Sequence, residues 1–295
     1  MHWDSKNSRP TKTVLLAVNK MSHPKATLII SFYNNFPFLK LVLGGLERQT
    51  VKGFEIIIAD DGSNEECKRK IMEYNKNSTL NIKHLWHKDE GWQKNRILNQ
   101  AIVASKTNYL VFIDGDCIPH RAFIEEHISN REIKTALAGR RVNLSEEVSS
   151  MLNYENVKDG YLEKRLLPIM VWGSIRDRGN RIENGIYVKS KIIRKKINKK
   201  ERGILGSNFS LFKKDIVDIN GFDERYRSPA VGEDTDIEYR LRNNGILIKS
   251  IKHLSIQYHL FHEKLYRPDK NLEILKQTME KKIVYTPFGI NKQFV

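Results

Sequence analysis

The sequence has little cysteine and no long apolar run. Only Cys67 and Cys117 occur in 295 residues, which argues against a disulfide framework and is typical of a reducing compartment. No stretch of about 18 consecutive apolar residues is present, so the sequence predicts no transmembrane helix. The apolar run 13–18 is short for a signal-peptide core and indicates a strand instead. We therefore expect a cytoplasmic protein.

Acidic residues are also scarce, because 35 acids face 51 lysines and arginines, for a formal net charge of +16. This excess predicts an anionic partner, such as nucleic acid, anionic lipid headgroups or a phosphorylated substrate. The segment 189–202 alone holds eight basic residues and one acid. Its Ile192, Ile193 and Ile197 share a helical face, which suits an anionic membrane surface. A solvated flexible loop fits the same pattern.

The first half of the chain alternates strand and helix signals. The expected strands are 27–32, 54–59, 82–86 and 109–113, and the expected helices are 36–49, 65–74 and 92–104. This alternation predicts an α/β fold with a mainly parallel central sheet flanked by helices. Polar clusters follow the strands, at the edge where open α/β sheets bind ligands.

The second half is less regular. We expect a strand at 135–142, a largely helical stretch at 145–167 and a long loop at 171–202. A long insertion of this kind is typical of a functional flap or a mobile segment. Regular structure should return at 206–212, followed by helices from Lys213 and from Glu233.

The motif Asp114-Gly115-Asp116 follows the apolar strand 109–113. The end of a strand brings both carboxylates to one point, and Gly115 permits a tight bend. Mg²⁺ and Mn²⁺ typically bind one or two carboxylates together with phosphate oxygens of a substrate. The motif therefore favours a metal site over the alternative, which is a polar turn with two solvated acids.

The acids Glu233 and Asp234 open a later helix. Acids in a first turn are expected from the helix dipole alone, so this motif is ambiguous by itself. One of these carboxylates could instead deprotonate an attacking hydroxyl. Neighbouring carboxylates and partial burial would raise its pKa toward that use.

Three further signals are weaker. Asp61 could accept a hydrogen bond from a base or a ribose, or it could simply serve an Asp-Gly turn. Lys94 and Arg96 lie at a helix start that favours phosphate, although exposed cations are ordinary there. His259 or His262 could complete a metal shell or be structural, and their spacing does not decide.

Taken together, these segments resemble the inverting glycosyltransferases of family 2, which share the Rossmann-like GT-A fold. The resemblance covers residues 26–262. Its nucleotide-binding half is carried by Ser31–Asn34, Asp60–Ser63, Arg96 and the Asp-x-Asp motif at 114–116. The other half is similar to the acceptor part of galactosyltransferase-like and chondroitin-polymerase-like enzymes, through Gly206–Ser210, Gly221–Glu224 and Gly232–Asp234.

The resemblance implies one continuous domain. Its parts are an extension at 1–25, a nucleotide-sugar half at 26–130, an acceptor half at 131–265 with a basic flap at 171–203, and a tail at 266–295. Family members often carry a Trp-Gly-rich stretch before the Glu-Asp pair, where this chain has Arg-Ser-Pro-Ala-Val at 227–231. Trp172 would then replace the aromatic platform for the acceptor sugar.

The resemblance also implies a role for each matching residue. Ser31, Tyr33 and Asp61 would contact the nucleotide, expected to be uridine, and Arg96 would approach the nucleotide or diphosphate. Asp114 would serve the ribose and the metal.

The implied metal is Mn²⁺ or Mg²⁺. Asp116 would be its firmer ligand, and His259 would be a further one, with His262 as the substitute. Asp234 would be the catalytic base, and Glu233 would position donor or acceptor hydroxyls.

The expected activity is transfer of a sugar from a UDP-sugar to a hydroxyl of a bacterial surface glycan, such as capsule or lipopolysaccharide. The acceptor could be lipid-linked, which would place the enzyme at the inner membrane face. A sugar-nucleotide nucleotidyltransferase is one alternative, but 31–35 lacks the Gly-rich phosphate loop usual there. A nucleic-acid-binding protein would explain the charge but not the strand-end acids, so no nucleic-acid partner is expected.

Overall fold

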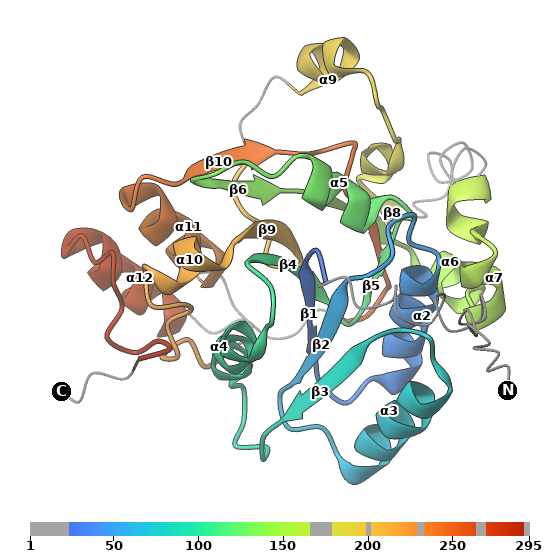
Figure 1. Cartoon of the computed structure of the whole chain (residues 1–295), viewed down its shortest axis with the longest axis horizontal. Helices are drawn as coiled ribbons and strands as arrows, with labels where there is room; N and C mark the ends of the chain where they lie inside the picture. The colour runs from blue at the N-terminus through green and yellow to red at the C-terminus, as the bar shows by residue number, and fades with distance from the viewer. Residues whose placement is uncertain (1–23, 166–178, 199–201, 229–232, 264–269, 292–295) are drawn as a thin grey trace, which may run out of the picture.

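The computed structural model describes residues 24–165, 179–198, 202–228, 233–263 and 270–291. Its centre is a seven-stranded sheet in the order β10-β6-β9-β4-β1-β2-β3 (Figure 1). These strands are β1 (Thr27–Phe32), β2 (Glu55–Asp60), β3 (Ile82–Trp86), β4 (Tyr109–Asp114), β6 (Thr135–Ala138), β9 (Asn208–Phe212) and β10 (Leu247–Ser250). Among them only β9 runs antiparallel to its neighbours, which confirms the mixed, mainly parallel sheet.

Helices cover both faces of this sheet because side chains alternate along each strand. Leu28 and Ile30 of β1 contribute to a core shared with α2 (Phe36–Glu47) and α3 (Glu65–Asn77). Ile29, between them, belongs to a second core. That core is shared with α4 (Lys94–Ala104), α10 (Lys213–Val217) and α11 (Glu233–Asn243), and α12 (Lys270–Glu280) packs on α11.

A second, four-stranded sheet brings the C-terminal half to the end of β4. Its order is β5-β11-β7-β8, with β5 (Cys117–Pro119), β11 (Ile256–His259), β7 (Arg140–Leu144) and β8 (Gly179–Asn180). Ile118, Val142 and Tyr258 join the core of α2, so the alternate residues face the other way. Cys117 lies opposite His259 in the register, which places β11 beside the turn that follows β4.

One expectation for the second half is wrong in detail, and another, the largely helical stretch, is confirmed as a series of short helices. The strand expected at 135–142 is two strands in different sheets, broken at Gly139. A Cβ there would lie 2.0 Å from Asn208 Oδ1, so the chain passes at a point where no side chain fits. The helical stretch expected at 145–167 begins as two short helices, α6 (Glu146–Ser150) and α7 (Tyr154–Lys158). The side chain of Asn153 caps α7 and interrupts the run.

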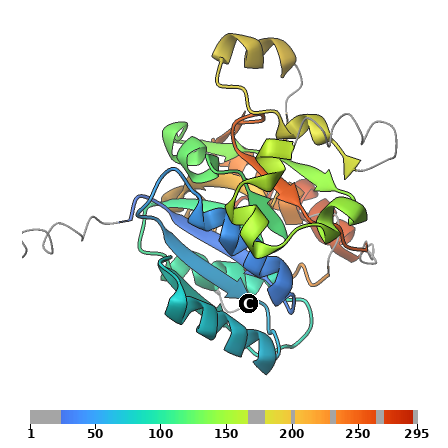
Figure 2. The ribbon, with the colours of Figure 1, turned by 90° about the vertical axis from the view of Figure 1, so that its right-hand side faces the viewer.

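The loop expected at 171–202 is also partly wrong. Its described part contains the 3-10 helix η2 (Ile182–Gly185) and the helix α9 (Lys191–Ile197), which Ser190 caps. Figure 2 shows α9 standing clear of the body of the protein. The expected platform residue Trp172 lies outside the described residues. No helix in the described ranges is long and apolar enough to span a bilayer.

Candidate active site

The turn after β4 begins with Asp114, which has two partners. Its Oδ1 accepts a hydrogen bond from Ser31 Oγ at 2.6 Å and lies 3.1 Å from Nζ of Lys94, the first residue of α4. Gly115 lets the turn fold back on β1, because its N–H donates to the Ser31 carbonyl at 2.8 Å. Ser31 and Asp114, both predicted for the nucleotide site, therefore lie together, and Lys94 joins them.

Asp116 meets two histidines. Its Oδ2 lies 3.5 Å from Nε2 of His259 and 3.3 Å from Nε2 of His262, and the two Nε2 atoms are 3.3 Å apart. Burial alone would raise the pKa of Asp116, but hydrogen bonds from His259 and His262 hold that pKa below its usual value. The bond to Asp116 in turn raises the pKa of His262. The structure thus brings both predicted histidines to Asp116, instead of one as a substitute for the other.

The three side chains fit a divalent metal. Nδ1 of His262 donates to the Glu263 carbonyl at 2.8 Å, so with a metal bound in place of the proton the neutral ring would offer the lone pair of Nε2 to the ion. Three such atoms 3.3–3.5 Å apart match ligands at about 2.1 Å from one ion. One carboxylate with two imidazoles suits Mn²⁺ better than Mg²⁺, which prefers oxygen. Cys117, although 3.2 Å from Asp116, stays a thiol because burial raises its pKa.

The acids at the start of α11, Glu233 and Asp234, lie close to Lys94. Burial alone would lower the pKa of Lys94, but the charges of Asp114, Glu233 and Asp234 raise it. One lysine therefore lies among three carboxylates that come from the end of β4 and the start of α11. This is the point at which the two halves of the predicted site meet.

Asp234 and Glu233, the first acids of α11, both have pKa values above their usual range. Asp234 Oδ2 accepts the N–H of Gly206 at 2.8 Å, and a Cβ at Gly206 would lie 2.2 Å from Oδ1. Burial is the main cause that raises the pKa of Asp234 and raises the pKa of Glu233 to about 7. Glu233 Oε2 is buried and has no hydrogen-bond partner among the described residues. Carboxylates whose pKa values are raised by burial are candidates for general-base work.

The next acid of α11 anchors this helix. Asp236 Oδ2 pairs with NH2 of Arg240 at 2.7 Å, and both side chains are buried. Arg240 also donates to the carbonyls of Ile219 and Gly221, each at 2.9 Å. Such further hydrogen bonds are needed for a buried ion pair to be stable. They hold the first turn of α11, and hence Glu233 and Asp234, in place.

Two other predicted nucleotide contacts already have partners within the protein. Buried Asp61 lies 2.8 Å from Nε2 of His87 and accepts the N–H of Gln93 at 2.9 Å. Tyr33 is half exposed, and its hydroxyl donates to Asp89 at 3.0 Å. Asp61 therefore connects the loop after β3 to the end of β2. A lone pair of its carboxylate that these contacts do not use remains available to accept a hydrogen bond from a ligand.

Arg96 lies on another face of α4. It is two residues beyond Lys94, which is more than half a helical turn, and it donates to Gln93 Oε1 at 2.9 Å. It lines a surface hollow of about 310 Å³ with Asn99, Gln100, Val103, Glu224 and Ile290. The structure does not bring Arg96 to Asp114, and Lys94 occupies that position. Helical spacing separates the two cations, but the sequence did not show which one faces the sheet.

Arg141 is a candidate that the sequence analysis overlooked. It lies opposite Gln257 in the register of β7 and β11, two residues from the row of His259. Its charge acts on both Asp234 and His262, so it lies within reach of the base and of the metal ligands. Its side chain forms no hydrogen bond or ion pair with the described part of the chain. The alternation of polar and apolar residues in 140–144 was the available signal.

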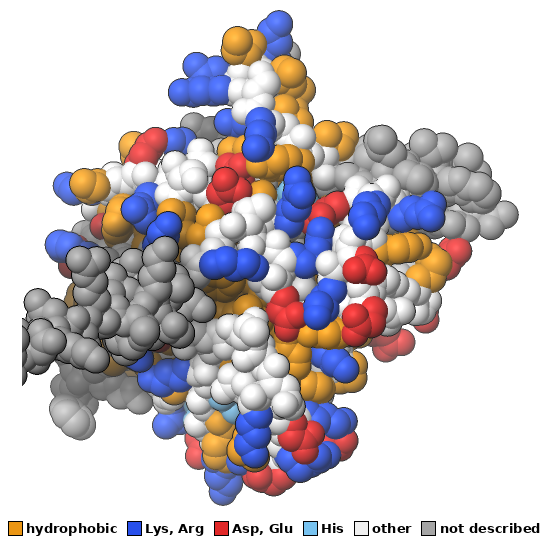
Figure 3. Space-filling model, turned by 45° about the vertical axis from the view of Figure 1, so that its right-hand side comes forward, with side chains coloured by type: hydrophobic (Ala, Val, Ile, Leu, Met, Phe, Trp, Pro, Cys, Tyr) orange, Lys and Arg blue, Asp and Glu red, His pale blue; other side chains and the backbone are white. Residues whose placement is uncertain are grey.

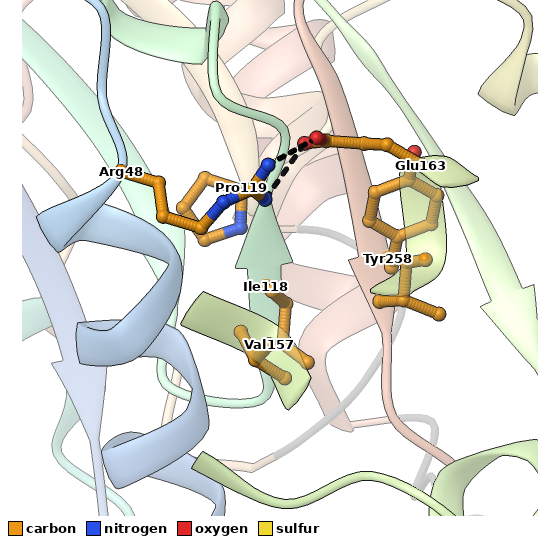
Figure 4. A pocket seen from close by; sticks show the side chains of 7 residues that line it. Arg48, Ile118, Pro119, Val157, Glu163 and Tyr258 are labelled. Atoms are coloured by element: carbon orange, nitrogen blue, oxygen red, sulfur yellow. Dashed lines mark hydrogen bonds and ion pairs between the residues drawn. The ribbon is translucent and has the colours of Figure 1, made fainter. Parts of the chain in front are cut away.

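A small cavity lies elsewhere, between α2 and the second sheet. Its volume is about 10 Å³, and Figure 4 shows an ion pair of Arg48 with Glu163 beside it. The other lining residues are Ile118, Pro119, Val157, Leu162 and Tyr258. This is room for about one water molecule, so the cavity is not a substrate site.

The mixed, mainly parallel sheet, with acids and histidines gathered at the end of the central strand β4, agrees with the GT-A fold that the resemblance implies. The model of glycosyl transferase family 2 matches residues 27–216, and the chain therefore belongs to this family and is a glycosyltransferase. A model described as the N-terminal domain of galactosyltransferase matches residues 188–263. Both halves of the resemblance drawn from the sequence are confirmed.

Curated relatives include two polysaccharide synthases. Chondroitin synthase of Escherichia coli is 27% identical over 234 residues, which cover 77% of this chain and 33% of that protein. Hyaluronan synthase of Pasteurella multocida is 24% identical over 239 residues, which cover 78% of this chain and 24% of that protein. The chain thus corresponds to a third or less of each synthase.

Solved structures show the same fold. Residues 1–349 of S. aureus TarS, in complex with UDP-GlcNAc, give a TM-score of 0.58 at 14% identity and cover 87% of this chain and 66% of that one. A mannosyltransferase from Pyrobaculum calidifontis, in complex with GDP-Man and Mn²⁺, gives 0.54 at 13% identity and covers 83% and 59%. At this identity the likeness shows the fold alone.

Proposed function

We propose that the protein is a metal-dependent, inverting glycosyltransferase that moves a sugar from a UDP-sugar to a hydroxyl of a bacterial surface glycan. The observation that carries this proposal is the meeting, around Lys94, of the acids after β4 with the acids that open α11. Displacement at an anomeric carbon needs a stabilised leaving group on one side and a base on the other. In this proposal Asp116 helps to stabilise the leaving group, and Asp234 is the base.

In the proposed reaction the acceptor oxygen bonds to the anomeric carbon as the bond from that carbon to the diphosphate breaks. The configuration at this carbon inverts in this single step. Asp234 takes the hydroxyl proton, and Glu233 orients a sugar hydroxyl through its unpartnered oxygen. Mn²⁺ held by Asp116, His259 and His262 would neutralise the leaving diphosphate.

Two cations of the chain add to this stabilisation. Lys94 and Arg141 both lie near the carboxylates of the site, where positive charge favours a diphosphate over the free acids. Ser31, Tyr33 and Asp61 are proposed to contact the nucleotide. Arg96 remains proposed for the outer part of the nucleotide, at a distance from Asp114.

The proposed acceptor is a glycan, free or lipid-linked. The relatives named as chondroitin and hyaluronan synthases support a polysaccharide acceptor.

The test is a release assay with purified protein, Mn²⁺ or Mg²⁺ and a panel of nucleotide sugars, with free nucleoside diphosphate as the readout. We expect slow, metal-dependent release from one UDP-sugar. Asp234→Asn should lower turnover by about 10²–10⁴-fold, the usual contribution of a general base, while donor affinity changes little. Asp218→Asn, at the exposed end of α10, is the matched control and should retain full turnover.

Unchanged turnover in Asp234→Asn would overturn the assignment of the base. Absence of both release and metal-dependent UDP binding in the unsubstituted protein would overturn the proposed reaction itself.

A further inference from the structure

The helix α9 exposes an apolar face that nothing in the described chain covers. None of its residues is buried, and Ile192, Ile193 and Ile197 are 71%, 50% and 48% exposed. Ile193 and Ile197 are four residues apart and therefore neighbours on one side of the helix. Three exposed isoleucines on a seven-residue helix form an apolar patch of the kind that marks an interaction site.

The same helix is surrounded by positive charge. Residues 184–200 contain no acid, and the basic residues of α9 and its start are Lys189, Lys191, Arg194, Lys195 and Lys196. Figure 3 shows lysine and arginine side chains beside apolar ones on the projecting part of the molecule. A partner must therefore offer negative charge and an apolar layer together.

The root of this projection is fixed to the body. Val188 N–H donates to the His253 carbonyl at 2.9 Å, and His253 Nδ1 donates to the Ile186 carbonyl at 3.0 Å. The Tyr187 hydroxyl donates to Glu126 of α5 (Phe123–Ser129). The projection is thus anchored by specific bonds where it leaves the protein.

The helix itself is capped at its start. Ser190 Oγ accepts the N–H of Ile193, and Arg194 donates to the Val188 carbonyl at 2.7 Å. An isolated seven-residue helix is unstable in water, so these local bonds keep α9 formed while its apolar face stays in solvent. The isoleucines are therefore presented without any need to unfold a core.

We propose that α9 docks on the surface of an anionic lipid bilayer. The three isoleucines enter the interface between headgroups and acyl chains, and the surrounding lysines contact the anionic headgroups. Lys196 lies among the isoleucines and reaches the headgroups by extending its long side chain. Nucleic acid and anionic polysaccharide offer the charge but no apolar layer, so they leave the isoleucines unexplained.

Docking of α9 would also fix how far the active site lies from the membrane surface. Gly206, which binds Asp234, follows Asn198 by eight residues, and a chain of that length spans at most about 26–29 Å. The base is therefore held within that distance of the docked helix, where a lipid-linked acceptor could reach it. This consequence rests on the proposed function, whereas the docking itself does not.

The test is flotation of the full chain with vesicles of neutral phosphatidylcholine, or of phosphatidylcholine with 30% phosphatidylglycerol, at low and high salt. We expect binding to the anionic vesicles only. Ile193→Ser/Ile197→Ser should lower the partition by at least tenfold. Lys195→Gln/Lys196→Gln should lower it by about 25-fold, since each cation near an anionic surface contributes about fivefold.

Matched controls are exposed positions outside α9. Lys76→Gln/Lys83→Gln removes the same charge from exposed positions of α3 and β3, and Met72→Ser/Ile133→Ser removes exposed apolar side chains elsewhere. These variants should bind vesicles within about threefold of the unsubstituted protein. The α9 variants should keep the melting temperature of the unsubstituted protein, because α9 has no buried residue.

Absence of binding to anionic vesicles at low salt would overturn the proposal. So would loss of binding in the lysine variant with full binding in the isoleucine variant, because that pattern shows a purely electrostatic site for a polyanion. Both outcomes are independent of turnover, so they are distinct from a failure of the proposed reaction.

Discussion

The ends of β2 and β4 look alike in sequence and differ in structure. Asp60, at the end of β2, is fully buried, and its oxygens accept from the Ser63 N–H at 2.8 Å and lie 2.8 Å from His84 Nε2. Asp116, after β4, meets two side chains from the distant segment around β11, and both are imidazoles. The two strand ends therefore differ in their neighbours, because two imidazoles meet Asp116, whereas one imidazole meets Asp60.

The largest effect should separate these two strand ends in activity. Asp116→Asn removes the only carboxylate of the proposed metal set and should lower Mn²⁺ affinity and turnover by at least about 100-fold. Asp60→Asn should keep the turnover of the folded protein within about threefold, because Asp60 faces no ligand. Mn²⁺ titration and nucleoside diphosphate release measure the two effects. Equal losses in both variants would remove the distinction.

A second test concerns the cation that the sequence analysis overlooked. Arg141→Gln should lower turnover by about 10²-fold, which is typical for loss of one charge-stabilising group. Arg131→Gln, on an exposed surface, is the control and should have no effect. If Arg141→Gln retained full turnover and full UDP affinity, Arg141 would have no part in the site.

A substitution at Asp60, which should leave turnover unchanged, should lower the stability of the fold, whereas a substitution at Glu233 in the proposed site should not. Asp60→Asn should lower the free energy of unfolding by about 1–3 kcal/mol, because it disturbs buried hydrogen bonds. Glu233→Gln should not destabilise the fold above pH 7, since the folded state there carries a half-buried charge whose pKa is raised. Urea unfolding at pH 8 measures both, and a destabilised Glu233→Gln would contradict the account.

The sign of the pH dependence follows from the same group. The pKa of Glu233 is raised to about 7 from 4.5, so the folded state binds more protons than the unfolded state between these values. This contribution to stability is present below pH 4.5, falls as the pH rises to 7 and stays absent above it. The curve of Glu233→Gln should lack this decline.

The smallest expected effect is on the shape of the rate profile. Because burial raises the pKa of Asp234, kcat/KM should rise with pH as this base loses its proton and then level off. The pH dependence of nucleoside diphosphate release checks this directly. A flat profile between pH 5.5 and 8 would mean that neither acid takes the proton.

Much of the N-terminal half could be predicted from the sequence because its strands are short, apolar and bounded by turns. The bounds of β1 and β3 agree with the expected ranges, and Asp114 and Asp116 lie at the expected strand end. The second half was harder because Gly139 ends one strand and lets the next join another sheet. Such a change of sheet depends on the close approach of Asn208, a contact between distant segments.

The residue types of the proposed site could be predicted from the sequence, but the directions of the side chains could not. The residue type alone indicates that acids and histidines can bind a metal or transfer a proton, so Asp116, His259 and Asp234 could be selected from the sequence. Whether Lys94 or Arg96 faces Asp114 depends on the rotation of α4 about its axis, which packing decides. Arg141 was hidden because a single arginine in a strand has no motif around it.

Calorimetric titration of UDP into the protein, with Mn²⁺ and separately with a chelator, measures whether a metal holds the nucleotide. We expect binding with Mn²⁺ and at least about 100-fold weaker binding without it, and we expect the same loss in His259→Ala/His262→Ala with Mn²⁺ present. Equal UDP affinity with Mn²⁺ and with chelator would contradict a metal site formed by Asp116, His259 and His262.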